Sequence, residues 1–186
     1  MQSEINTALK ILNKGGILLY PTDTVWGIGC DATNKNAVAK IYALKNREES
    51  KSMICLVNNT EMLGRHLQKV PKKALDIIKQ SQNPTTIIYD APKNIASNLI
   101  AKDNTLAIRI VNHSFCNALI EKLQNPLVST SANISGDSCP KDFKEISEHI
   151  LKGVDYVVNL PSKKTTIQPS TIIKINNDGA IEIIRK

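Results

Sequence analysis

The segment of residues 17–32 reads ILLYPTDTVWGIGCDA and guides the interpretation of the whole chain. It begins with a short apolar run that is typical of a β-strand. A proline, two threonines, an aspartate and two glycines follow, and proline and glycine interrupt regular strand pairing. The segment therefore predicts a polar pocket wall at the end of a strand, with Gly27 and Gly29 in a tight turn.

A second segment has the same order of residue types. Residues 126–136 read PLVSTSANISG, so small polar residues again follow a short apolar run. Two strands that end in this way predict one shared polar site.

Length and composition indicate one globular domain over residues 1–186, because the chain is long enough to bury a core and its 41% hydrophobic and 22% charged content is ordinary. No apolar run approaches the roughly 20 residues that span a bilayer, and the N-terminus lacks the pattern of a signal peptide. The four cysteines have no paired spacing and are interpreted as reduced thiols of a cytoplasmic protein (Cys30, Cys55, Cys116 and Cys139).

The formal net charge is +7, from 24 basic and 17 acidic residues. This excess favours an anionic partner such as a nucleotide, a phosphate or a nucleic acid, although solubility alone also explains such a charge. Aromatic residues make up only 4% of the chain, which argues against a module that stacks bases on aromatic rings.

The spacing of apolar residues predicts alternating helices and strands. Helices are expected over residues 4–12, 36–45, 61–67, 72–79, 113–123 and 142–151. Strands are expected over 17–20, 53–57, 85–89, 106–111, 127–130, 154–158, 171–175 and 180–184, with a turn at 176–179 between the last two. This order predicts an α/β fold with a mixed sheet.

Several familiar kinds of site are absent from the sequence. It contains no P-loop and no Gly-x-Ser-x-Gly nucleophile elbow, and Gly27-x-Gly29 lacks the third glycine of a dinucleotide fingerprint. The three histidines have no metal-ligand spacing, so no metal site of the protein's own is expected (His66, His113 and His149).

A basic cluster lies at the end of the predicted helix over residues 36–45. Lys45, Arg47 and Lys51 could converge on a polyphosphate, since arginine offers a fork of donors and lysine a compact charge. The alternative is a solvated helix end whose cations interact with the helix dipole.

Arg109 stands in an otherwise apolar strand, TLAIRIV over residues 105–111. A buried guanidinium without an anionic partner is costly, so a carboxylate is expected beside it. That carboxylate could belong to the protein or to a ligand.

Five ordered blocks together resemble the YrdC family of threonylcarbamoyl-AMP synthases. They are residues 20–29, the Lys45-x-Arg47 pair with Lys51, residues 106–109, residues 129–136, and the PSTII run over residues 169–173. The resemblance covers nearly the whole chain and implies a twisted α/β sheet, flanked by helices, around a concave basic cavity.

The resemblance also implies a reaction. L-threonine, bicarbonate and ATP would form threonylcarbamoyl-adenylate and pyrophosphate, with Mg²⁺ on the phosphates as the expected cofactor. A separate transfer complex would then pass the threonylcarbamoyl group to tRNA. Two alternatives stay open: a tRNA-binding module without turnover, and a related domain that handles carbamoyl-adenylate.

Site residues follow from the matching motif positions. Threonine contacts are implied for Thr24, Arg109, Ser131 and Ser170, and nucleotide or phosphate contacts for Arg47, Lys51, Thr105, Asn133 and Arg185. Lys45, Arg47 and Lys51 are the implied catalytic cations. The chain departs from the family pattern at Ser52, Met53, Leu56, Asn83 and Lys174, which bears most on the detailed threonine contacts.

Overall fold

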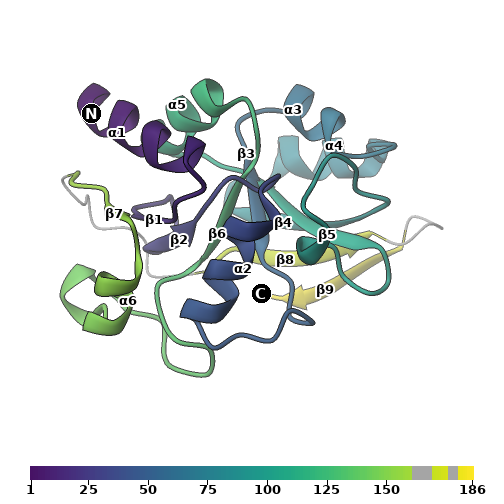
Figure 1. The fold of residues 1–186 in the computed structure, drawn as a ribbon. Helices are drawn as coiled ribbons and strands as arrows, with labels where there is room; N and C mark the ends of the chain where they lie inside the picture. Colours follow the sequence, from purple (N-terminus) through teal and green to yellow (C-terminus); the bar gives the residue numbers. More distant parts are fainter. Residues whose placement is uncertain (161–168, 176–179) are drawn as a thin grey trace.

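A computed structural model, shown in Figure 1, describes residues 1–160, 169–175 and 180–186 of the chain. Nine strands in these ranges form one sheet in the order β7-β1-β2-β6-β3-β5-β4-β8-β9. Their bounds are β1 Leu18–Tyr20, β2 Gly27–Gly29, β3 Ile54–Val57, β4 Thr85–Asp90, β5 Thr105–Ile110, β6 Leu127–Ser131, β7 Tyr156–Val157, β8 Thr171–Ile175 and β9 Ile181–Arg185. The pairs β1/β7, β3/β5 and β4/β8 are parallel and the others antiparallel, which confirms the predicted mixed sheet.

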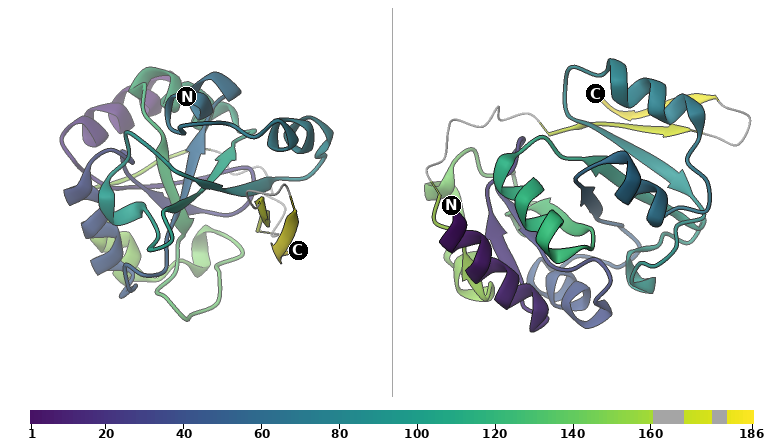
Figure 2. Two further views of the ribbon diagram at one scale, coloured as in Figure 1. Left: turned by 90° about the vertical axis from the view of Figure 1, so that its right-hand side faces the viewer. Right: turned by 90° about the horizontal axis from the view of Figure 1, so that it is seen from above.

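Helices cover both faces of this sheet. Figure 1 shows α1, α5, α3 and α4 above the sheet and α2 and α6 below it, and the view from above in Figure 2 agrees. The helices are α1 Gln2–Asn13, α2 Lys35–Leu44, α3 Thr60–Arg65, α4 Lys72–Gln80, α5 Ser114–Leu123 and α6 Glu148–Gly153, with short 3₁₀ turns η1 Ser97–Leu99 and η2 Phe143–Glu145. In the described part of the chain no helix has the length and hydropathy needed to cross a membrane.

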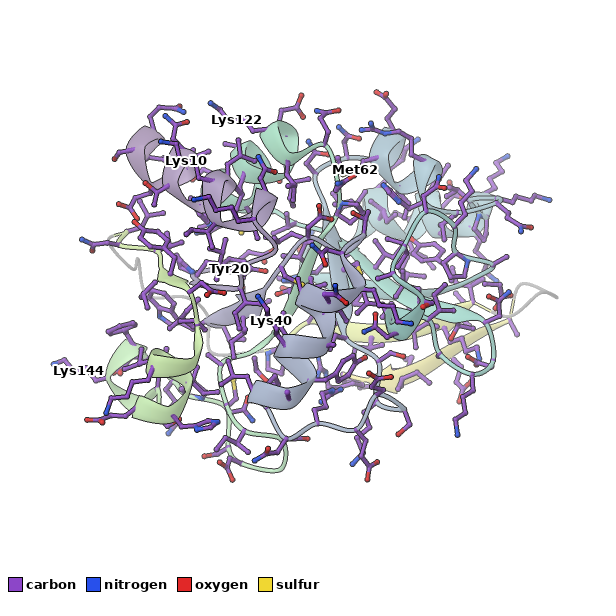
Figure 3. All side chains as sticks on the ribbon, in the orientation of Figure 1. Lys10, Tyr20, Lys40, Met62, Lys122 and Lys144 are labelled. Carbon is purple, nitrogen blue, oxygen red and sulfur yellow. The ribbon has the colours of Figure 1, made fainter. Side chains whose placement is uncertain are left out.

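The core lies between the sheet and the helices. Tyr20 and Met62 are fully buried, whereas Lys10, Lys40 and Lys122 extend from the surface, as the side-chain view in Figure 3 shows. Burial of this continuous apolar set on folding is the main stabilising contribution.

The prediction of a tight turn at Gly27 and Gly29 is wrong, because both residues belong to the buried strand β2. β2 pairs with β1 on one side and with β6 on the other. A Cβ atom added at Gly29 would lie 2.0 Å from the main-chain oxygen of Val128 and 2.8 Å from the ring of Tyr20. The glycine is therefore required by the close approach of a neighbouring backbone and ring inside the sheet.

The predicted helix over residues 142–151 is also wrong in extent. Two short pieces, η2 and α6, replace it, and Ile146 between them has an extended backbone. Asp142 accepts a hydrogen bond from the Lys144 N–H, and Ser147 accepts one from the Ile150 N–H, so each piece begins at its own N-cap. The remaining elements lie within a few residues of the predicted ranges, and the predicted turn over 176–179 falls outside the described residues.

Candidate active site

Arg109 is the buried cation at the centre of the candidate site, with 4% of its side chain exposed. It lies near the end of β5, and its Nη2 atom is 3.0 Å from Oδ1 of Asp23. Its Nη1 and Nη2 atoms also donate to Oγ1 of Thr24, at 3.3 and 3.4 Å. Of the two partners left open by the sequence, the structure shows the protein carboxylate.

Asp23 and Thr24 belong to the turn that leaves β1. The hydroxyl of Thr22 donates to the main-chain oxygen of Val25 at 2.7 Å and accepts from the Thr24 N–H at 3.1 Å. These contacts fold the turn so that the carboxylate and the Thr24 hydroxyl both meet Arg109. The predicted polar pocket wall is thus a hydrogen-bonded turn against β5.

A second group of polar side chains comes from strand β4, from the residue before β8 and from strand β9. The hydroxyls of Thr86 and Ser170 are 2.8 Å apart, and Ser170 is buried. Arg185 donates from Nε and Nη2 to the main-chain oxygen of Ser170, at 3.1 and 2.9 Å. Burial lowers the pKa of Arg185, and the nearby charge of Arg109 lowers it further. Like charges repel, so an anion bound near both arginines would be stabilised.

Lys45 is buried beneath the segment that follows β6. Its Nζ atom donates to the main-chain oxygens of Ser131, at 2.5 Å, and of Asn133. Burial lowers the pKa of Lys45 to about 8, and the charge of Arg47 contributes in the same direction. Here Lys45 holds the Ser131–Asn133 backbone in place through main-chain contacts.

Arg47 and Lys51 lie in the loop after α2. Arg47 is half-buried, and it donates from Nε to the main-chain oxygen of Lys51 at 2.7 Å and from Nη2 to that of Ser52 at 3.0 Å. Lys51 is exposed, and its Nζ atom lies 3.8 Å from Oε2 of Glu48. Arg47 therefore shapes the loop, whereas the Lys51 ammonium is free to move toward a ligand.

Asn133 borders a cavity of about 310 Å³ that Ser138, Glu145 and Ser147 also line. Its Nδ2 atom donates to the main-chain oxygens of Ile134 and Asp137, both at 2.9 Å. Its Oδ1 atom is buried and has no hydrogen-bond partner among the described residues. An acceptor in this position is suited to a ligand hydroxyl or amine.

Thr105 lies at the other end of β5, four residues before Arg109 and hence about 13 Å along the strand. Its hydroxyl donates to Oδ1 of Asp103 at 2.7 Å, and Lys174 lies 2.9 Å from the other oxygen of that carboxylate. The structure therefore separates Thr105 from the group around Arg109.

Cys139 lies close to both the Lys45 group and the Arg185 group. Burial raises the pKa of its thiol, and the positive charges of Lys45 and Arg185 act in the opposite direction.

Sequence reasoning missed three polar residues of this arrangement, namely Thr22, Asp23 and Thr86. Thr22 and Asp23 were visible in the pocket-wall segment, but nothing local to the sequence showed which cation they would meet. Within the described ranges, no three or more metal-ligating side chains lie together.

The Sua5/YciO/YrdC family model, described as telomere recombination, matches residues 10–186. A threonylcarbamoyl-AMP synthase from Pseudoalteromonas translucida is 36% identical over 174 residues, covering 92% of each chain. A putative threonylcarbamoyl-AMP synthase from Methanocaldococcus jannaschii is 39% identical over 177 residues, covering 94% of this chain and 81% of the relative.

Several solved structures are also similar to this chain. E. coli YciO has a TM-score of 0.87 at 26% identity, covering all of this chain and 90% of YciO. P. abyssi Sua5 in complex with L-threonine has a TM-score of 0.85 at 26% identity, covering 94% of this chain. This chain spans about half of the Sua5 chain, 51% in that complex. A nucleotide-bound HypF structure, at 23% identity and a TM-score of 0.84, shows the shared fold alone.

Proposed function

We propose, because the chain belongs to the Sua5/YciO/YrdC family, that it forms threonylcarbamoyl-adenylate and pyrophosphate from L-threonine, bicarbonate and ATP. The relatives that are named threonylcarbamoyl-AMP synthase match it over most of their length. The observation that carries the proposal is the set of contacts around two guanidinium groups: Arg109 donates to the Thr24 hydroxyl, and Arg185 donates to the Ser170 backbone, whose hydroxyl meets that of Thr86.

This arrangement suits a small hydroxylated amino acid. Arginine binds a carboxylate through two parallel hydrogen bonds, so Arg109 is assigned to the carboxylate of threonine. Ser170 and Ser131 are assigned to its polar groups. A site that bonds the substrate hydroxyl rejects an analogue that lacks it, because buried polar groups are then left unpaired.

The chemistry requires cations more than an acid or a base. The amine of threonine attacks the carbon of bicarbonate, a C–O bond breaks and water leaves, which gives a carbamate. An oxygen of this carbamate then attacks the α-phosphorus of ATP, and pyrophosphate leaves. Both reacting groups are anions, so positioned cations lower the barrier by holding them together. Arg47, Lys51 and Arg185 are the cations proposed to contact phosphate, Thr105 and Asn133 the proposed polar contacts to the nucleotide, and Lys45 holds the backbone beside them.

Mg²⁺ is proposed to arrive with ATP as part of the substrate. It prefers oxygen ligands, keeps several waters and is commonly bound through substrate phosphates. Asp23, the carboxylate beside Arg109, is already engaged by that arginine and by the Asn112 N–H.

The test is pyrophosphate release from ATP with threonine and bicarbonate, added singly and together. The proposal requires release only when both are present. Release with ATP alone, or with only one of the two co-substrates, would contradict it. Steeply salt-dependent tRNA binding without any turnover would favour a tRNA-binding module instead. The downstream transfer complex is a prediction from the family resemblance, and the cytoplasmic location is a prediction from the N-terminal pattern and the cysteine spacing.

The basic cluster has a separate test. Replacing Arg47 and Lys51 together by alanine should abolish pyrophosphate release and leave the fold intact, because both side chains lie in a loop outside the core. Turnover and circular dichroism are the two measurements. Wild-type turnover in the double variant would remove the cluster from the proposed site.

A further inference from the structure

Arg109 is held from one direction by a single turn. The guanidinium has five N–H groups. Nη2 meets Asp23 at 3.0 Å, and Nη1 and Nη2 meet the hydroxyl of Thr24. The Nε–H group is buried and has no partner among the described residues. An unpaired buried donor is costly, so a bound ligand is the expected partner for the free part of the guanidinium.

The hydroxyls of the turn have one consistent pattern of donors. Thr22 has a single hydroxyl proton, which goes to the Val25 oxygen at 2.7 Å. In the 3.0 Å contact between the two threonine hydroxyls, Thr24 is therefore the donor. The lone pairs of Thr24 are then left for the two N–H groups of Arg109. Thr24 thus orients Arg109 and has no proton left to give to a substrate.

Asp23 links this turn to the end of β5. Its Oδ1 atom meets Arg109, and its Oδ2 atom accepts from the main-chain N–H of Asn112 at 3.1 Å. Only 10% of its side chain is exposed. The contact at Oδ1 is an ion pair without a hydrogen bond, whereas Oδ2 accepts a main-chain hydrogen bond, so Oδ2 fixes the carboxylate and the ion pair holds the guanidinium opposite.

Electrostatics alone would make Asp23 unfavourable here. A negative charge beside Arg109 weakens the attraction of that arginine for an anion. If charge were its only effect, removing it would strengthen anion binding. If its role is to orient the guanidinium, removing it would weaken anion binding, so the sign of the change separates the two roles.

On these grounds, and resting on the proposed function, we propose that Asp23 is a positioning residue for threonine binding. With Thr22 and Thr24 it holds the guanidinium of Arg109 in the orientation that receives the carboxylate of threonine.

Asp23→Asn is the decisive variant, since it keeps the size of the side chain and removes its charge. We expect the KM for threonine to rise about tenfold or more, while kcat and the KM for ATP stay within about twofold. Calorimetric titration with L-threonine should show the same loss of affinity. An unchanged or lower KM for threonine would overturn the proposal.

Asp103→Asn is the matched control, because it removes the same charge at the other end of β5, beside Lys174. Its KM for threonine should equal that of the wild type. Thr22→Val is a second test variant that alters no charge and should raise the KM for threonine about threefold. If Asp23→Asn does not fold, Thr22→Val tests the proposal in its place, and a wild-type KM for threonine in Thr22→Val overturns it. A wild type that binds threonine without turnover would contradict the proposed function alone, because the binding comparison still tests Asp23.

Discussion

Strand β5 has an ion pair near each of its ends, and the two pairs differ in burial rather than in length. Arg109 and Asp23 lie 3.0 Å apart with 4% and 10% of their side chains exposed. Lys174 and Asp103 lie 2.9 Å apart with 27% and 54% exposed. Exposed pairs contribute little because water screens them, whereas a buried pair that loses one partner leaves an uncompensated charge. A distance alone therefore does not identify the functional pair.

The largest expected difference is in turnover. Arg109→Ala should lower kcat/KM for threonine about a thousandfold, because it removes the proposed carboxylate contact and leaves Asp23 unpaired. Lys174→Ala should leave kcat/KM at the wild-type value. Steady-state pyrophosphate release measures both variants, and equal losses in the two would erase the distinction between the two ends of β5.

A smaller difference is expected in stability. Asp23→Ala should lower the free energy of unfolding by about 3 kcal/mol, since the buried guanidinium loses its carboxylate. Asp103→Ala should unfold at the same denaturant concentration as the wild type. Urea titration monitored by circular dichroism gives both values. A wild-type midpoint for Asp23→Ala would mean that water replaces the carboxylate without cost.

Lys45 extends the comparison of the two ion pairs, because it is a buried cation whose partners are carbonyl oxygens and not a carboxylate. Burial lowers its pKa from 10.5 to about 8 in the folded protein. Between pH 8 and 10.5 the unfolded chain therefore binds more protons at this residue, and its contribution to stability rises with pH by about 3 kcal/mol.

Unfolding free energies of the wild type and of Lys45→Met, measured from pH 7 to 10.5, test this. The wild type should gain stability relative to the variant as the pH rises. Comparing the two proteins cancels the effects of tyrosine and cysteine titration, because these are common to both. Parallel curves for the two proteins would show that Lys45 keeps its ordinary pKa.

The smallest expected effect is on the reactivity of Cys139, the exposed thiol among four free cysteines. It lies near Lys45 and Arg185, so ATP with threonine should slow its alkylation about threefold. The buried thiols of Cys30, Cys55 and Cys116 should stay unlabelled in the folded protein. An unchanged rate of alkylation would mean that the ligands bind away from Cys139.

Most of the fold was predictable because its signals are local. Apolar residues recur with helical or strand spacing, and these repeats lie within a few residues of the observed elements. Strand β2 was not predicted because glycine is uncommon in strands. Glycine is needed at position 29 because the Tyr20 ring and the Val128 backbone approach it closely, and the local sequence does not show this contact. The helix over 142–151 was extended too far because the caps at Asp142 and Ser147 each start a separate turn.

The site was predictable in its residue types and less so in its contacts. An arginine in an apolar strand required an anionic partner, but the sequence could not identify Asp23 as that partner. Lys45 was predicted among the catalytic cations, and its contacts with main-chain oxygens could not be inferred from spacing. Thr105 matched a motif position, yet it lies four residues along the strand from Arg109.

The order of strands in the sheet has a consequence for folding. Arg109 meets Thr24 across 85 positions of sequence, Thr86 meets Ser170 across 84, and Lys45 meets Asn133 across 88. Contacts this distant in sequence form slowly, because the entropy of closing long loops is lost before they are made. In a refolding experiment, helical signal should return before threonine binding does, so recovery of binding would report the completion of the sheet.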